Sequence, residues 1–104
     1  MKYNVELHNF VSEKIAEVNK LLRSNYDRDN DDLDITLNSI SLHQGLDVVV
    51  KVNFEASSES AYETVIGVIE LDYVTFRKPI SEIYDEIVYL VEENFAASSD
   101  PHFD

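Results

Sequence analysis

Apolar residues recur every three or four positions near both ends of the chain and every second position between them. The first spacing places apolar side chains on one side of a helix, and the second is typical of strands. The pattern predicts a helix from about residue 4 or 5 to about residue 25 and another from Pro79 to about Ser98. Their apolar sides are formed by Leu7, Phe10, Val11, Ile15, Val18, Leu21 and Leu22, and by Ile80, Ile83, Tyr84, Ile87, Leu90, Val91 and Phe95.

Two strands follow the first helix. The alternation of apolar residues that begins at Leu33 shifts by one position after Leu37, which predicts a bulge near Asn38 and Ser39. Residues 43–45 indicate a compact hairpin. The second strand alternates cleanly, with Val48, Val50, Val52 and Phe54 on one face and Asp47, Lys51, Asn53 and Glu55 on the other.

The third strand is predicted over about residues 61–75 and has apolar residues on both faces. That composition indicates the middle of a sheet or a covered second face. Gly67 interrupts the strand and predicts a bulge or a close backbone approach. Val65, Ile69, Leu71 and Tyr73 share one face, and Ile66, Val68 and Val74 share the other.

The order helix, three strands, helix predicts an α+β fold. We expect a two-layer sandwich, in which a three-stranded antiparallel meander carries an N-terminal and a C-terminal helix on one face. A chain of 104 residues is one domain by size. We assign that domain to residues 1–97 and expect residues 98–104 to form a flexible tail.

Eight basic and 21 acidic residues give a net charge of −13. Most of that charge lies after residue 26, where four bases face eighteen acids. Such a field repels nucleic acids and membranes and attracts basic proteins or cations. The alternative is that the charge only keeps a small protein soluble.

The sequence contains no cysteine, no signal-peptide pattern and no apolar run of membrane-spanning length, so we expect a cytoplasmic protein without a membrane partner. Only two glycines are present, and phosphate-binding glycine loops and nucleophile elbows are absent. The three histidines match no metal motif. We therefore predict a protein that is not an enzyme and has no cofactor.

An acidic loop follows the first helix. Its oxygen-bearing side chains at alternate positions resemble the opening of a calcium-binding loop. That motif needs glycine at its sixth position and glutamate at its twelfth, where this chain has Asp32 and Asn38. The alternative is a solvated acidic turn. The acids of this loop are Asp27, Asp29, Asp31 and Asp32.

The last helix has five carboxylates and no base between residues 79 and 98. At about 100° per residue all five fall on one side of the helix, with Tyr89 among them. They span roughly 17 Å at about 1.5 Å per residue, whereas one DNA strand carries a phosphate every 3.4 Å or so. We expect an uncompensated anionic strip formed by Glu82, Asp85, Glu86, Tyr89, Glu92 and Glu93.

The charges of this strip are expected to destabilise the helix, because like charges are neighbours and acids lie near the helix C-terminus. Such inconsistency is expected at functional surfaces. We therefore predict that the strip, with the loop acids as a second patch, binds a basic protein, itself expected to bind nucleic acid, in place of phosphates. Anti-CRISPR inhibitors of phage and other DNA mimics are similar in size, charge and element order. This chain is expected to be a monomer or homodimer that does not contact nucleic acid directly.

A second hypothesis is an oligomeric structural or chaperone-like subunit. Residues 46–56 followed by residues 61–76 resemble the central hairpin of SecB-type export chaperones, which are also acidic. The resemblance implies assembly through sheet and helix edges and an apolar groove for unfolded chains. The opening helix departs from the strand-first order of that family.

Overall fold

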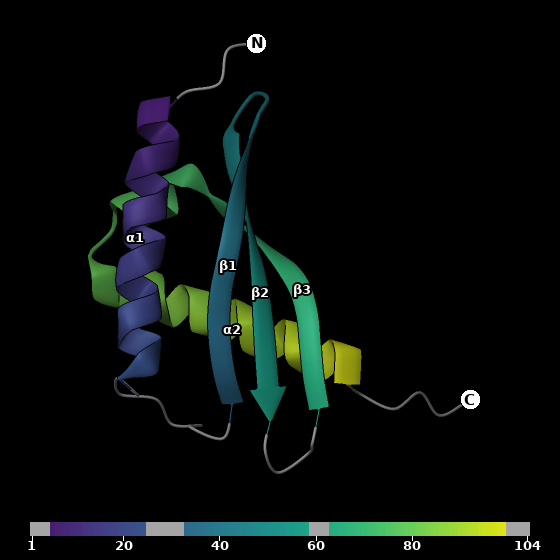
Figure 1. The fold of residues 1–104 in the computed structure, drawn as a ribbon. Helices are drawn as coiled ribbons and strands as arrows, with labels where there is room; N and C mark the ends of the chain where they lie inside the picture. The colour runs from purple at the N-terminus through teal and green to yellow at the C-terminus, as the bar shows by residue number, and fades with distance from the viewer. Residues whose placement is uncertain (1–4, 25–32, 59–62, 100–104) are drawn as a thin grey trace.

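The computed structural model describes residues 5–24, 33–58 and 63–99, and it confirms the predicted α-β-β-β-α order. The elements are helix α1 (Val5–Arg23), strands β1 (Leu33–Gln44), β2 (Val48–Ser58) and β3 (Glu63–Asp72), the short 3₁₀ helix η1 (Tyr73–Arg77) and helix α2 (Ile80–Ser99) (Figure 1).

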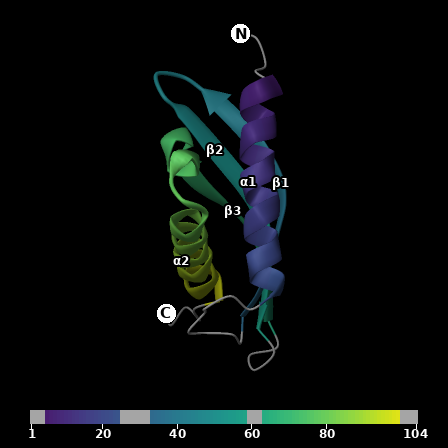
Figure 2. The ribbon, with the colours of Figure 1, turned by 90° about the vertical axis from the view of Figure 1, so that its left-hand side faces the viewer.

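The three strands form an open antiparallel meander in the order β1-β2-β3, as predicted. Buried residues alternate along each strand, and the register aligns them across the sheet: Leu37 lies opposite Phe54, and Val52 opposite Ile69. One face of the sheet is therefore apolar. α2 crosses that face and α1 lies beside β1 (Figures 1 and 2), and both helices bury apolar side chains against the same face, so the fold is a two-layer α+β sandwich.

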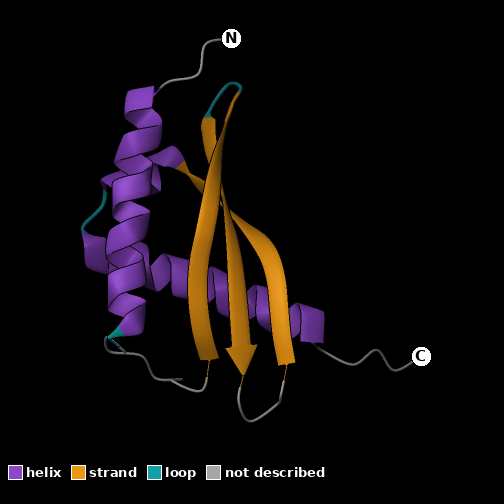
Figure 3. Ribbon diagram, viewed as in Figure 1, coloured by secondary structure: helices purple, strands orange, loops and turns teal. Residues whose placement is uncertain are grey.

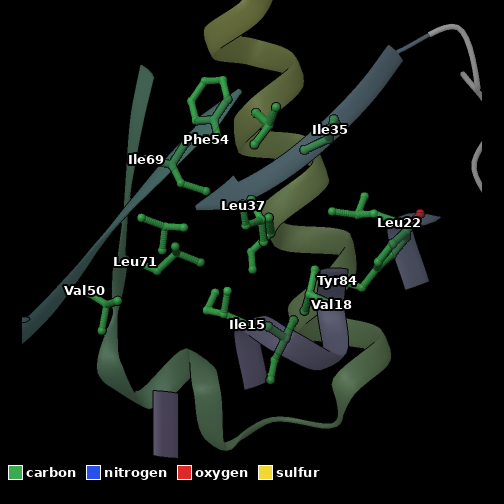
Figure 4. Close-up of a cluster of buried hydrophobic side chains, with 14 of the residues drawn as sticks. Ile15, Val18, Leu22, Ile35, Leu37, Val50, Phe54, Ile69, Leu71 and Tyr84 are labelled. Carbon is green, nitrogen blue, oxygen red and sulfur yellow. The ribbon is translucent and has the colours of Figure 1, made fainter. Parts of the chain in front are cut away.

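The core lies between the sheet and the two helices (Figure 4). α1 contributes side chains such as Val11 and Val18, and α2 contributes Tyr84 and Ile87, all at most 1% exposed. Burial of one such side chain contributes about 1.5–3 kcal/mol. Among the described residues no helix combines the length and apolar character needed to cross a membrane.

The bulge was predicted correctly, whereas the hairpin turn lies at residues 45–47, two residues later than predicted, because His43 and Gln44 pair with β2. The register between β1 and β2 shifts between Leu37 and Ile40, because residues 38 and 39 form the expected irregularity. The extra residue returns Ile40 and Leu42 to the helix-covered side of the sheet, opposite Val52 and Val50. Without the bulge, the second half of β1 would direct its apolar side chains to solvent.

The prediction that the third strand continues to about residue 75 was wrong. β3 ends at Asp72, and η1 carries the chain from the sheet towards α2 (Figure 3). In a 3₁₀ helix, residues three apart share a side, so Tyr73 and Phe76 both pack against the core while Val74 remains exposed.

α2 begins one residue later than predicted. The carbonyl of Pro79 accepts hydrogen bonds from the backbone N–H groups of Glu82 and Ile83, at 2.9 and 3.2 Å. Pro79 therefore occupies the N-cap position, immediately before the first residue of α2. α2 ends at Ser99, and residues 100–104 of the predicted tail lie outside the described residues.

One side chain of α1 bonds the outer edge of β1 at Leu37. Asn19 Nδ2 donates to the carbonyl of Leu37 at 2.9 Å, and the Leu37 N–H donates to Asn19 Oδ1 at 3.0 Å. This amide pair copies the bonding of a neighbouring strand at the residue just before the bulge. The edge of β1 is thus tied to the helix beside it.

Asn19→Ala removes both bonds and leaves a partly buried N–H and carbonyl without their partners. We expect the free energy of unfolding to fall by about 1–3 kcal/mol. Urea denaturation measures it. The matched control is Asn9→Ala at an exposed position of the same helix, for which a change within about 0.5 kcal/mol is expected. Equal losses in both variants would contradict the role given to Asn19.

Gly67 lies where α2 approaches the sheet, which confirms the predicted close approach. A Cβ atom there would lie 2.9 Å from the ring of Phe54 and 3.0 Å from Asn94 Oδ1. Gly67 pairs with Phe54 in an unbroken register, so the alternative of a bulge at this position was wrong. The missing side chain lets the ring of Phe54 and the amide of Asn94 both lie close to the backbone of Gly67.

Gly67→Ala must displace the fully buried ring of Phe54. Overpacking of this kind costs about 1–3 kcal/mol, which we expect as a loss of unfolding free energy. At Gly45 an added Cβ meets nothing within 4 Å, so Gly45→Ala is the matched control, with an expected change within about 0.5 kcal/mol. Thermal and urea unfolding of the two variants, run in parallel, test the difference.

Candidate partner-binding surface

α2 directs its charged side away from the core. Glu82, Asp85 and Glu93 are exposed, and Tyr89 as a whole residue is 58% exposed. The structure places all six predicted residues on this one helix, and two of the acids, Glu86 and Glu92, are partly buried. We call this surface the acidic strip: Glu82, Asp85, Glu86, Tyr89, Glu92 and Glu93.

The expectation that the strip is uncompensated was wrong at one position. Lys78, just before α2, places its Nζ 3.6 Å from Glu86 Oε1, and both side chains remain partly exposed. Ion pairs of this type are worth about 0–1 kcal/mol. Lys78 therefore offsets part of the charge at the N-terminal end of the strip, and among the described residues no other ion pair involves its acids.

Tyr89 and Glu93 form a pair one helical turn apart. The Tyr89 hydroxyl donates to Glu93 Oε2 at 2.8 Å. This hydrogen bond and the negative charge of Glu93, with a smaller effect of burial, raise the pKa of Tyr89 above its ordinary value. The bond holds the hydroxyl within the strip and leaves the face of the ring available for contact.

The second predicted patch is the acidic loop after α1. Its residues lie outside the described part of the chain: Asp27, Asp29, Asp31 and Asp32. Within the described ranges, no group of three or more histidine, aspartate or glutamate side chains is arranged to hold a metal ion.

Sequence reasoning missed a groove beside the strip, where β3 meets α2. Its apolar lining comes from both elements, and two carboxylates and one amide complete it. Glu93 belongs both to this groove and to the acidic strip. The lining residues are Val68, Ile69, Glu70, Leu90, Glu93 and Asn94. The apolar residues on both faces of the third strand were the only sequence signal for it.

A second cleft lies between α1 and η1. Lys14 places its Nζ 5.5 Å from the centre of the Phe10 ring, and that ring lies 6.0 Å from the ring of Tyr73. Lys14 thus extends along apolar surface, as is usual for a lysine in an apolar stripe. Glu6 and Arg77 also line this cleft, so its charges have mixed sign.

Comparison with protein-family models, with curated proteins and with solved structures finds no match to this chain. Functional inference therefore depends on the surfaces described above.

The pKa of Tyr89 tests the geometry of the strip. Glu93→Gln removes the negative charge and keeps an oxygen acceptor, so the pKa of Tyr89 should fall towards its ordinary value of about 10. Tyrosine ¹³Cζ resonances, assigned with Tyr89→Phe, report this titration. The control is Glu92→Gln, which changes the same charge on the neighbouring residue and should leave the pKa of Tyr89 as in the parent. Indistinguishable titrations in the parent and Glu93→Gln would contradict the hydrogen bond.

Proposed function

We propose that this protein is a small acidic binding protein that inhibits or neutralises a basic, nucleic-acid-binding protein, as a DNA mimic does. The acidic strip occupies the partner's basic surface in place of phosphates. Carboxylates accept charge-assisted hydrogen bonds from arginine and lysine, as phosphates do. The exposed ring of Tyr89 supplies an aromatic anchor of the kind found at the centre of interfaces.

The observation that carries this proposal is the arrangement of charge on α2. The helix contains five acids and no base, and its acids lie on the side away from the core. An ordinary exposed helix face gains stability from opposite charges three or four residues apart. Here Glu82 instead has Asp85 and Glu86 as its neighbours, and only Glu86 has a described ion-pair partner.

The acids follow one side of α2 from Glu82 in the first turn to Glu93. A surface with no role beyond solubility needs no such alignment. α1 is the contrast within the same chain, because it carries exposed bases as well as exposed acids, and Glu17 has Lys20 three residues further on.

The test compares two triple charge reversals with the same net charge. Glu82→Lys/Asp85→Lys/Glu86→Lys changes the strip, and Glu6→Lys/Glu13→Lys/Glu17→Lys changes exposed acids of α1. The parent should capture one basic protein from nuclease-treated lysate of its native host, more strongly at low than at moderate salt. The strip variant should capture at least roughly tenfold less of this protein than the parent does. The α1 variant should capture about as much as the parent.

Circular dichroism and mass measurement of each free variant establish that the fold and the oligomeric state are unchanged. Undiminished capture by the strip variant would refute the proposal. Equal loss in both variants would also refute it, because net charge rather than the strip would then determine binding.

A further inference from the structure

The two edges of the sheet are finished differently. On the outer edge of β1, Asn19 bonds both backbone groups of one residue, Leu37. Among the described residues, β3 pairs with β2 alone, so no strand bonds its outer edge. A strand with an open edge presents a row of backbone donors and acceptors that another strand can pair with.

The side chains of β3 are those of an interior strand. Ile69 and Leu71 are buried under the helices, whereas Ile66 and Val68 on the other face are 77% and 45% exposed. The apolar residues on both faces predicted the middle of a sheet or a covered second face, and both alternatives were wrong for the described residues, because β3 is the edge strand of the meander and its second face is exposed. β3 therefore combines an open edge with exposed apolar side chains.

The last turns of α2 lie beneath the position that a strand paired with the open edge of β3 would occupy. In Figures 1 and 3 the last turns of α2 extend past β3 on the side away from β2. The groove between them is lined by Val68 and Ile69 of β3 and by Leu90 of α2. A strand added to a sheet lies about 4.7–4.9 Å from its neighbour. One strand beside β3 would therefore rest on the projecting turns of α2.

The negative charge of the groove favours a basic segment as its occupant. Glu70 of β3 and Glu93 of α2 line it, and Lys51, whose Nζ lies 3.8 Å from Glu70 Oε2, offsets only part of this negative charge. A second copy of this chain would bring a further Glu70 and Glu93 to the same edge. An extended segment with lysine or arginine among apolar residues complements both carboxylates and the apolar lining.

We propose that β3 accepts an extended, basic segment of the partner as a fourth strand of the sheet. This inference rests on the proposed function and names the part of the partner that is bound. Backbone hydrogen bonds to β3 would provide affinity, and alternate side chains would provide selectivity, as in other complexes formed by strand addition. Glu93 joins the two surfaces, because it belongs to both the groove and the acidic strip.

The test uses three blocked eight-residue peptides and the full ¹⁵N-labelled chain. The first peptide alternates lysine and valine. The second replaces every lysine with glutamate. The third keeps the lysines and replaces two valines with proline, so it has the same charge but is a poor strand former because proline cannot donate to the ladder. Amide hydrogen exchange of β3 is measured at saturating peptide.

We expect the lysine–valine peptide alone to slow exchange of the outward-facing β3 amides by about tenfold or more. Glu70→Gln/Glu93→Gln should weaken its binding roughly three- to tenfold. The matched control Glu13→Gln/Glu17→Gln makes the same charge change on α1 and should bind like the parent.

Equal binding of the proline peptide without protection of β3 would overturn strand addition and leave charge-driven binding intact. Absence of binding by any peptide would also overturn it. Protection of the β3 edge before any peptide is added, with a dimeric mass, would assign the edge to a second copy instead. The proposed function fails separately, through the strip variants, whose substitutions at residues 82, 85 and 86 lie outside this groove.

Discussion

A three-stranded sheet has one apolar face to cover, and in this protein two helices of 19 and 20 residues cover it together. Neither helix alone is wide enough to shield three strands, since a helix with its side chains is about 10–12 Å across. Val18 of α1 and Ile87 of α2 are therefore both fully buried in one core. The orientation of each helix about its own axis follows from this packing.

The outward direction of the acidic strip is a consequence of that constraint. Ile83, Ile87 and Val91 fix the inner side of α2, so the opposite side must face solvent. Its acids were expected there from spacing alone, and the structure places them as expected. The detail that spacing missed is Lys78, which reaches Glu86 from the segment that joins η1 to α2. Local geometry at a helix start is not encoded in helical periodicity.

Gly67 allows α2 to approach β3 closely, and this approach forms the groove beside the acidic strip. Because this residue has no side chain, Phe54 fills the space beneath it, and Asn94 approaches from α2. That approach places the C-terminal turns of α2 beside the edge of β3, where Leu90 and Glu93 form one wall of the groove. A close contact inside the fold thus sets the geometry of an outer surface, and it makes Glu93 common to both candidate contact regions.

Sequence alone determined the order of elements, the bulge at residues 38 and 39, most of the core and the side of α2 that bears charge. These properties follow from periods of 3.6 and 2 residues, which depend only on neighbours along the chain. Tertiary structure decided that the chain turns into η1 after Asp72, that Lys78 reaches Glu86, and that Asn19 bonds the outer edge of β1 at Leu37. Such features depend on which distant segments meet, and no local period carries that information.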